Sequence, residues 1–449
     1  MTGDAQAGFI AANRFGFGPR PGDLAAIGGA PRDWLLDQLA RPAALPAELR
    51  DLPPGRQGAA EFLRVRRDGA EAIKTLAQTK FKAELFREIN ARTLAMIKSA
   101  TPFRERLVAF WSNHFTVSAS RFYVAPIAGG FEREAIRPHV TGKFVDMLLA
   151  VARHPAMLFY LDNISSIGPN SIAGRRTKRG LNENLAREIM ELHTLGVDGG
   201  YTQEDVTSFA RMLTGWSVDG VPPRGEPTGA FRFFALAHEP GDKTLLGKRY
   251  PEAGEDEAEA ALRDLARHPS TARFIATKLV RHFVADDPPP TAVARIARVF
   301  TETDGDLGRV SAALINLDEA WAAPLPKMKS PYDFVVSAAR AVGLTETPAP
   351  PNGFVASLHV LSQVPFTAPS PKGWPDTAAD WLSPEALMHR IEWARAFAAR
   401  LPDILRPKQL YADTIAPVAT ETTRSGIELA PSGVEGNAMI LASVEFQRR

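Results

Sequence analysis

The sequence of 449 residues contains no cysteine. This absence excludes disulfide bonds, thiolate metal sites, iron–sulfur clusters and cysteine nucleophiles. No apolar run approaches the length of a membrane-spanning helix, and the first residues lack the basic segment and long apolar core of a secretory signal. We therefore expect a soluble protein without a membrane span that stays in the cytoplasm. A periplasmic location stays open, because a cysteine-free chain tolerates both compartments.

Several catalytic and nucleotide-binding motifs are also missing. The chain has no G-x-S-x-G or S-x-x-K pattern for a nucleophilic serine, no Walker spacing, and no G-x-G-x-x-G after a candidate strand. Its formal net charge of +2 gives no argument for nucleic-acid binding. We therefore expect no nucleotide cofactor, no thiolate-bound cofactor and no nucleic-acid partner.

The sequence does contain extensive helical periodicity. Hydrophobic residues make up 45% of the chain and charged residues 23%, as in an ordinary globular protein. The pattern predicts a mainly α, irregular multi-helix domain with a small β-hairpin insertion around 230–250, where FRFFALA and KTLLGKRY are the candidate strands. Residues 1–449 form essentially one domain, with four subregions: N-terminal helices and a linker (1–58), a helical core (59–216), the β insertion (217–255), and C-terminal helices with a loop-rich stretch at 345–380 (256–449).

The most informative segment is 180–216, GLNENLAREIMELHTLGVDGGYTQEDVTSFARMLTGW. It predicts two helices, and Thr202 with an acidic residue three positions later predicts a capping box at the start of the second. At about 100° per residue, the first helix carries a polar stripe opposite an apolar face that includes His193. The stripe consists of Asn184, Arg187, Glu188 and Glu191.

This motif is accompanied by FWSNHFTVS, RPHVTGKFVDMLLAVARHPAMLFYLDN, HEPGDKTLLGK, HPSTARFIATKLVRHFVADDPPP, PYDFVVSAARAVG and ASVEFQRR. Together these segments resemble the bacterial "domain of unknown function 1800" (DUF1800) family over nearly the whole chain. The resemblance implies one helical architecture but no established reaction. Such proteins are often encoded beside an exported family, domain of unknown function 1501 (DUF1501), which resembles alkaline phosphatases and sulfatases. The resemblance therefore also implies a DUF1501 protein as a partner.

A carboxylate–histidine site is the main catalytic hypothesis. Glu188 and Glu191 lie about one helical turn apart and could act as general bases or metal ligands, with Arg187 and Asn184 beside them. Carboxylate bundles that hold two metals use Glu-x-x-His, which this chain lacks, and His193 lies about 160° from Glu191 on a helix. A compact metal site within EIMELH is therefore disfavoured. A divalent metal would instead need ligands from several segments: Glu188, His114, His139 and His154, with His238 as a further choice.

Each of these features also has a structural interpretation. The glutamates could pair with Arg187, and histidines beside proline could cap helix ends. The basic stretch GRRTKRG at 174–180 could bind an anion, but an exposed, irregular loop is the commoner outcome. Glycoside hydrolysis could use Asp162 as a second carboxylate, with nearby aromatic residues stacking on sugar. We favour core positions for these aromatics: Trp111, Phe159, Tyr160 and Trp216.

Two functions of different classes follow. The first is a hydrolytic enzyme with a carboxylate–histidine site, with or without a divalent metal, in which His114 serves as ligand or acid/base. The second is a non-catalytic partner or scaffold for the exported DUF1501 protein. Ion pairs at Glu188 and Glu191 on the surface, away from any pocket and from the histidines, would favour the second function.

Overall fold

The computed structural model describes residues 2–222, 225–322, 325–349, 353–402 and 405–449. Helices dominate these residues, which confirms the predicted mainly α class. The helices up to the central motif are α1 (Thr2–Ile10), α2 (Asp23–Ile27), α3 (Pro31–Ala40), α4 (Gly55–Val65), α5 (Ala70–Leu76), α6 (Lys82–Lys98), α7 (Pro102–His114), α8 (Ala128–Phe131), α9 (Phe144–Arg153), α10 (Pro155–Tyr160), α11 (Ile172–Thr177) and α12 (Asn184–Glu188).

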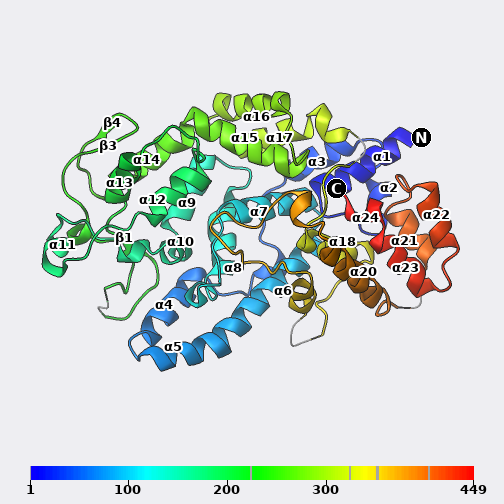
Figure 1. Cartoon of the computed structure of the whole chain (residues 1–449), viewed down its shortest axis with the longest axis horizontal. Coiled ribbons are helices and arrows are strands. Elements are labelled where there is room, and N and C mark those ends of the chain that lie inside the picture. Colours follow the sequence, from blue (N-terminus) through cyan, green and yellow to red (C-terminus); the bar gives the residue numbers. More distant parts are fainter. Residues whose placement is uncertain (1, 223–224, 323–324, 350–352, 403–404) are drawn as a thin grey trace.

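The helices that follow are α13 (Gln203–Met212), α14 (Glu255–Arg267), α15 (Pro269–Phe283), α16 (Pro290–Glu302), α17 (Leu307–Ile315), α18 (Pro331–Ala341), α19 (Phe354–Val360), α20 (Pro384–Ala398), α21 (Pro407–Asp413), α22 (Glu421–Glu428), α23 (Gly433–Ala442) and α24 (Val444–Gln447). The first and last helices lie together at one end of the molecule, α11 and α13 lie at the other, and α7 crosses the middle (Figure 1). Of the helices in the described ranges, none has the length and apolar character that crossing a bilayer requires.

The predicted β insertion is confirmed, and it consists of two small antiparallel sheets rather than one hairpin. β3 (Lys243–Leu245) pairs with β4 (Lys248–Tyr250), as a hairpin of KTLLGKRY should. β2 (Phe231–Phe233) pairs instead with β1 (Trp216–Val218), which directly follows the central motif. All three residues of β1 are buried, and a strand of three residues is too short for its alternation to identify it in the sequence.

The central motif forms the two predicted helices, with one irregularity. After α12 the chain continues into a π-helical turn, Ile189–His193, closed by a hydrogen bond of 2.7 Å from Thr194 Oγ1 to the Ile189 carbonyl. His193 is fully buried on the packing face, as predicted. The capping box is also confirmed: Thr202 accepts the Asp205 N–H, and the Asp205 carboxylate accepts the Thr202 N–H.

The basic stretch at 174–180 is exposed, as expected, but its first half is helical rather than irregular. It contains the end of α11, which begins where Ser171 Oγ accepts the N–H of Gly174 at 3.0 Å. A Cβ at Gly174 would lie 2.1 Å from the carbonyl oxygen of Gly168. This glycine therefore allows the close approach of α11 to the preceding turn.

A buried ion-pair network fixes α7 against α6 and the segment after α8. Glu132 accepts hydrogen bonds from Arg92 at 2.6 Å, from Ser112 at 2.8 Å and from Arg137 at 3.1 Å. Arg137 also donates to Glu105 of α7 at 2.9 Å. The aromatic residues near α7, α10 and β1 belong to the core, as favoured from the sequence: Trp111, Phe159, Tyr160 and Trp216.

In the described part of the loop-rich stretch 345–380, the α-helix is α19. Its first N–H, that of Phe354, donates to Asn90 Oδ1 of α6 at 2.8 Å. The cap therefore comes from a residue more than 200 positions earlier, because the residue before the helix, Gly353, has no side chain to accept this N–H. The later part of the stretch, 363–377, is irregular and borders a cavity, and it ends in a 3₁₀ turn, Ala378–Asp380.

Candidate active-site cavity

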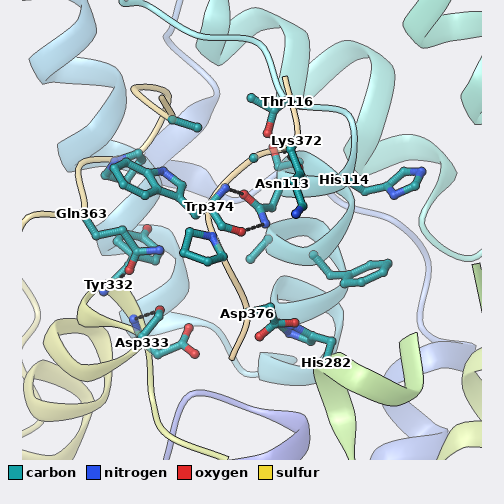
Figure 2. A pocket seen from close by; sticks show the side chains of 18 of the residues that line it. Asn113, His114, Thr116, His282, Tyr332, Asp333, Gln363, Lys372, Trp374 and Asp376 are labelled. Atoms are coloured by element: carbon teal, nitrogen blue, oxygen red, sulfur yellow. Dashed lines mark hydrogen bonds and ion pairs between the residues drawn. The ribbon is translucent and has the colours of Figure 1, made fainter. Parts of the chain in front are cut away.

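A cavity of about 590 Å³ lies between α7, α15, the start of α18 and the loop 363–380. Six residues of α7 line the cavity, and four of them are spaced as one helical face, at i, i+4, i+7 and i+8: Arg106, Phe110, Asn113 and His114. α15 contributes a second face with Lys278, Arg281 and His282 at i, i+3 and i+4. Two helices thus present charged and polar side chains to a common space, opposite a loop that carries Lys372, Trp374 and Asp376 (Figure 2).

A side chain of α7 and a backbone N–H of α18 hold the loop in place. The Asn113 amide donates to the Trp374 carbonyl at 2.9 Å and accepts the Trp374 N–H at 2.8 Å, as a paired β-strand would (Figure 2). On the other side, Gln363 Oε1 accepts the Tyr332 N–H at 2.8 Å. Gly373 has φ +84°, and a Cβ there would lie 2.4 Å from the Asn113 carbonyl oxygen, so only glycine allows this close approach.

A histidine–carboxylate pair lies at the base of the loop. His282 Nδ1–H donates to Asp376 Oδ2 at 2.7 Å, and Arg106 donates to His282 Nε2 at 3.4 Å. This arrangement requires the neutral imidazole, because Nε2 must accept. Burial lowers the pKa of His282 to about 4, aided by Arg449 and Arg106 and opposed by Asp376. Burial raises the pKa of Asp376, but His282, Lys327 and Arg449 outweigh it and hold that pKa well below its usual range.

Each of the four acidic side chains in the cavity wall has a hydrogen-bond or ion-pair partner, and Arg449 and Lys327 each pair with two of them. Asp333 accepts from Arg106 at 3.2 Å and lies 3.3 Å from Arg449, and Asp376 accepts from Arg449 at 3.1 Å. Asp286 binds Lys327 at 2.5 Å and also accepts the Ala378 N–H at 2.7 Å. Asp380 accepts a hydrogen bond from Thr377. The carboxylates of the wall are therefore already paired with protein groups.

Three cationic side chains of the wall have no carboxylate partner among the described residues: Lys278, Arg281 and Lys372. Arg281 donates only to the backbone carbonyl of Asp286, at 3.3 Å. Burial lowers the pKa of Lys278 to about 8; Asp376 opposes this shift, and the nearby charges of Arg281 and Lys372 strengthen it. Like charges gathered in a cavity destabilise one another, and a bound anion would relieve that repulsion.

His114 borders the cavity together with Asn113, while Trp111 belongs to the core, as favoured from the sequence. His114 Nε2–H donates to the His193 carbonyl at 3.1 Å, and Nδ1 has no hydrogen-bond partner among the described residues. Burial and the nearby Lys278 lower the pKa of both histidines, that of His193 to about 3. In Figure 2 the His114 ring extends away from Trp374 and Asp376. His114 therefore contributes an uncharged imidazole to the cavity wall.

The polar stripe of the central motif lies outside this cavity. Asn184 is exposed, and Arg187 binds Glu183 at 3.1 Å and Glu191 at 3.5 Å along the helix surface. Glu188 is half-buried without a hydrogen bond or ion pair in the described ranges, and burial with the neighbouring Glu191 raises its pKa. The interpretation of the stripe as an ion-paired surface thus holds for Arg187 and Glu191. It does not hold for Glu188, which has no ion-pair partner in the described ranges.

The remaining candidate ligands are also dispersed. His154 Nε2–H donates to Glu134 at 3.1 Å, and its Nδ1 accepts the Ala156 N–H at 3.1 Å. His154 therefore caps a helix, as predicted, but at the N-terminus of α10 rather than at free carbonyls. His139 is half-buried, and burial lowers its pKa. Within the described residues no three side chains among histidines, aspartates and glutamates form a group that could hold a metal ion. The predicted combination of Glu188 with His114, His139, His154 or His238 is therefore not assembled there.

Comparison with known protein families agrees with the motif resemblance. The family model described as "Protein of unknown function (DUF1800)" matches residues 10–448. The chain belongs to the DUF1800 family. No curated protein and no solved structure matches it.

The cavity residues that sequence reasoning missed lie within DUF1800 segments or beside them. Lys278 and His282 are part of HPSTARFIATKLVRHFVADDPPP, and Arg449 ends ASVEFQRR. Asp376 lies in GWPD, inside the stretch read only as a loop. The i, i+4 spacing of Lys278 and His282 was a usable signal, because a mostly apolar helix does not need two such residues on one face.

Proposed function

We propose that this DUF1800 protein is an enzyme that binds a small organic anion in the cavity between α7 and α15. The observation that carries the proposal is the charge imbalance of the wall. Its acids are engaged by Arg106, Arg449, Lys327 and His282, whereas Lys278, Arg281 and Lys372 face the cavity without a carboxylate. Phosphate, sulfate or carboxylate groups match such a cluster.

The wall also suits the organic part of such a ligand. Phe110, Tyr332, Phe366 and Trp374 line the cavity beside the cations. Cavities of this size, with apolar walls and a few charged groups, are typical of small-molecule sites. The carboxylate–histidine pair expected from the sequence has its best counterpart here in His282 and Asp376. A hydrolytic reaction that used His282 as a base would first need its Nε2 to exchange the contact with Arg106 for water or substrate.

Calorimetric titration of the purified protein with inorganic phosphate, sulfate and citrate tests the anion site. The triple variant K278Q/R281Q/K372Q should weaken binding about tenfold or more, a loss of about 1.4 kcal/mol or more. The matched control is R175Q/R176Q/K178Q, which removes the same charge from the exposed α11 region. If both triple variants weakened binding equally, the effect would come from the overall charge of the protein and not from the cavity. Unchanged binding in K278Q/R281Q/K372Q would overturn the proposal.

We also propose a second candidate function, a protein contact at the motif face. Arg187 holds two carboxylates along the surface and reaches Gln203 of α13 at 2.8 Å, so the face presents an ordered array outside the cavity. The partner suggested by the family resemblance is a DUF1501 protein. Co-purification of the two proteins, lost on R187E and retained on R175E, is the expected result. Retention with both variants would argue against this surface.

A further inference from the structure

We propose that Lys278 is a nucleophilic amine that forms an imine with the carbonyl of a 2-oxo acid held in the cavity. The proposal rests on the proposed anion site and names the substrate class for it. The geometric basis is the position of Lys278, which lines the cavity from α15 within the cation cluster and makes no hydrogen bond or ion pair in the part of the chain that the structure describes.

Lys278 has no carboxylate partner among the described residues that would hold it as a fixed cation, and its cation–π contact is with Phe274. Its Nζ lies 5.6 Å from the centre of the Phe274 ring, and that ring lies 6.3 Å from the His114 ring. On the sides of α7 and the π-helical turn, His114 and His193 stay neutral because burial lowers their pKa values. On α15 the neighbours are Arg281 and His282, and on the loop they are Lys372 and Asp376. Asp376 is already shared by His282, Arg449 and Lys327.

Burial, strengthened by the charges of Arg281 and Lys372 and opposed by Asp376, lowers the pKa of the Lys278 amine, so its uncharged form is available at ordinary pH. With the pKa of Lys278 lowered to about 8, about a tenth of the side chain is uncharged at pH 7, against less than about a thousandth for an ordinary lysine. Burial combined with neighbouring cations is a known way to activate a lysine for attack on carbonyl carbon. Lys372, the other lysine of the wall, is exposed and serves the anion.

The same cluster selects the substrate. A carboxylate bound by Arg281 and Lys372 lies beside Lys278, so the reactive carbon must be adjacent to the anionic group, as the carbonyl carbon of a 2-oxo acid is. The Lys278 nitrogen attacks that carbon and forms a C–N bond, giving a carbinolamine. The carbon–oxygen bond then breaks, and the oxygen leaves as water with the two amine hydrogens. A C=N bond remains, and no oxidant or reductant is consumed.

Reductive trapping tests this step on the full-length protein. Incubation with pyruvate and cyanoborohydride at pH 7–8 should give one adduct, which peptide mass spectrometry should place on Lys278. The rate of trapping should rise with pH through about 8. The variant K278R keeps the positive charge and should lose the adduct while it still binds phosphate. Adducts spread over surface lysines such as Lys74 and Lys408, or an unchanged adduct in K278R, would overturn the proposal.

Further experiments test the imine and the anion site independently of each other. Phosphate binding without any adduct on Lys278 would refute the imine and leave the anion site standing. An adduct on Lys278 that forms equally fast with neutral acetaldehyde, in a protein that binds no phosphate, would refute the anion site and with it the 2-oxo acid. Phosphate and the 2-oxo acid should compete for binding. Loss of this competition in K278Q/R281Q/K372Q, but not in R175Q/R176Q/K178Q, would place the anion site and the imine in the same cavity.

Discussion

The motif face on α12 and the cavity between α7 and α15 are both rich in charge, but they balance it differently. On α12 the partners lie four residues apart, Glu183 and Glu191 on either side of Arg187. In the cavity, Asp333 and Asp376 are joined to Arg106 and Arg449 from distant parts of the chain. The first arrangement is local and exposed, whereas the second is buried and depends on the whole fold.

This difference teaches that a polar helical stripe can identify a family without containing the reactive groups. Exposed pairs at i, i+4 stabilise a helix by about 0.3–0.5 kcal/mol each, because solvent screens both charges. A buried ionic network is different, since each member left without its partner keeps the full cost of desolvation. The cavity therefore has both the larger energetic consequences and the unmatched cations. Four substitutions, described in order of decreasing effect, test this contrast.

The largest effect is expected for Asp333→Asn. Asp333 lies between the buried guanidinium groups of Arg106 and Arg449, at 3.2 and 3.3 Å. The substitution removes the negative charge that both buried guanidinium groups share. The free energy of unfolding should therefore fall by about 3–5 kcal/mol. Urea denaturation measures it. The surface control is Asp219→Asn, which breaks the exposed pair with Arg232. A loss below about 1 kcal/mol for Asp333→Asn would mean that the buried network is not a stabilising element.

The second prediction concerns the buried face of the motif and uses pH. Burial lowers the pKa of His193 to about 3, so the folded protein keeps this side chain neutral while the unfolded chain binds a proton below about pH 6.5. Because only the unfolded chain takes up this proton, the free energy of unfolding falls as the pH drops from about 6.5 toward 3, by about 1.4 kcal/mol per pH unit. His193→Leu should therefore gain about 2 kcal/mol relative to the natural protein between pH 7 and pH 5.

Urea denaturation at both pH values measures this gain, and exposed His359→Leu is the matched control. The two ring nitrogens of His193 have no hydrogen-bond partner among the described residues, so leucine removes no bond there. An identical effect of His193→Leu at pH 5 and pH 7 would contradict the neutral, buried state. The contrast with Glu191, two residues earlier on the surface, would then lose its basis.

Asn113→Ala is expected to have an intermediate effect on stability and a specific effect on binding. The substitution frees both the N–H and the carbonyl of Trp374, at a cost of about 1–2 kcal/mol. Because Asn113 positions the loop that carries Lys372 and Asp376, phosphate affinity should fall with it. Asn90→Ala removes a comparable side-chain cap, on α19, away from the cavity wall. It should cost similar stability and leave affinity unchanged; equal losses of affinity in both would mean that Asn113 acts only through global stability.

These contacts also show what the sequence could and could not predict. Helical periodicity gave the mainly α fold, the two motif helices and the capping box at Thr202, because those signals span only a few residues. The buried position of His193 followed from the same periodicity. The site did not follow, because the pairing of His282 with Asp376 joins α15 to an irregular loop 94 residues later. Nothing local marks Asp376 as a partner, and the same holds for Asn90 as the cap of α19.

The smallest effect is expected for Arg187→Gln on the motif face. Its side chain is about one-third exposed, and its pairs with Glu183 and Glu191 lie along one helix, so unfolding free energy should fall by less than about 1 kcal/mol. Phosphate binding and imine trapping should be unchanged, because the face lies outside the cavity. Urea denaturation and calorimetry on one protein preparation measure both. If Arg187→Gln abolished ligand binding at unchanged stability, the motif face and the cavity would have to be one functional unit, and the separation drawn between them would fail.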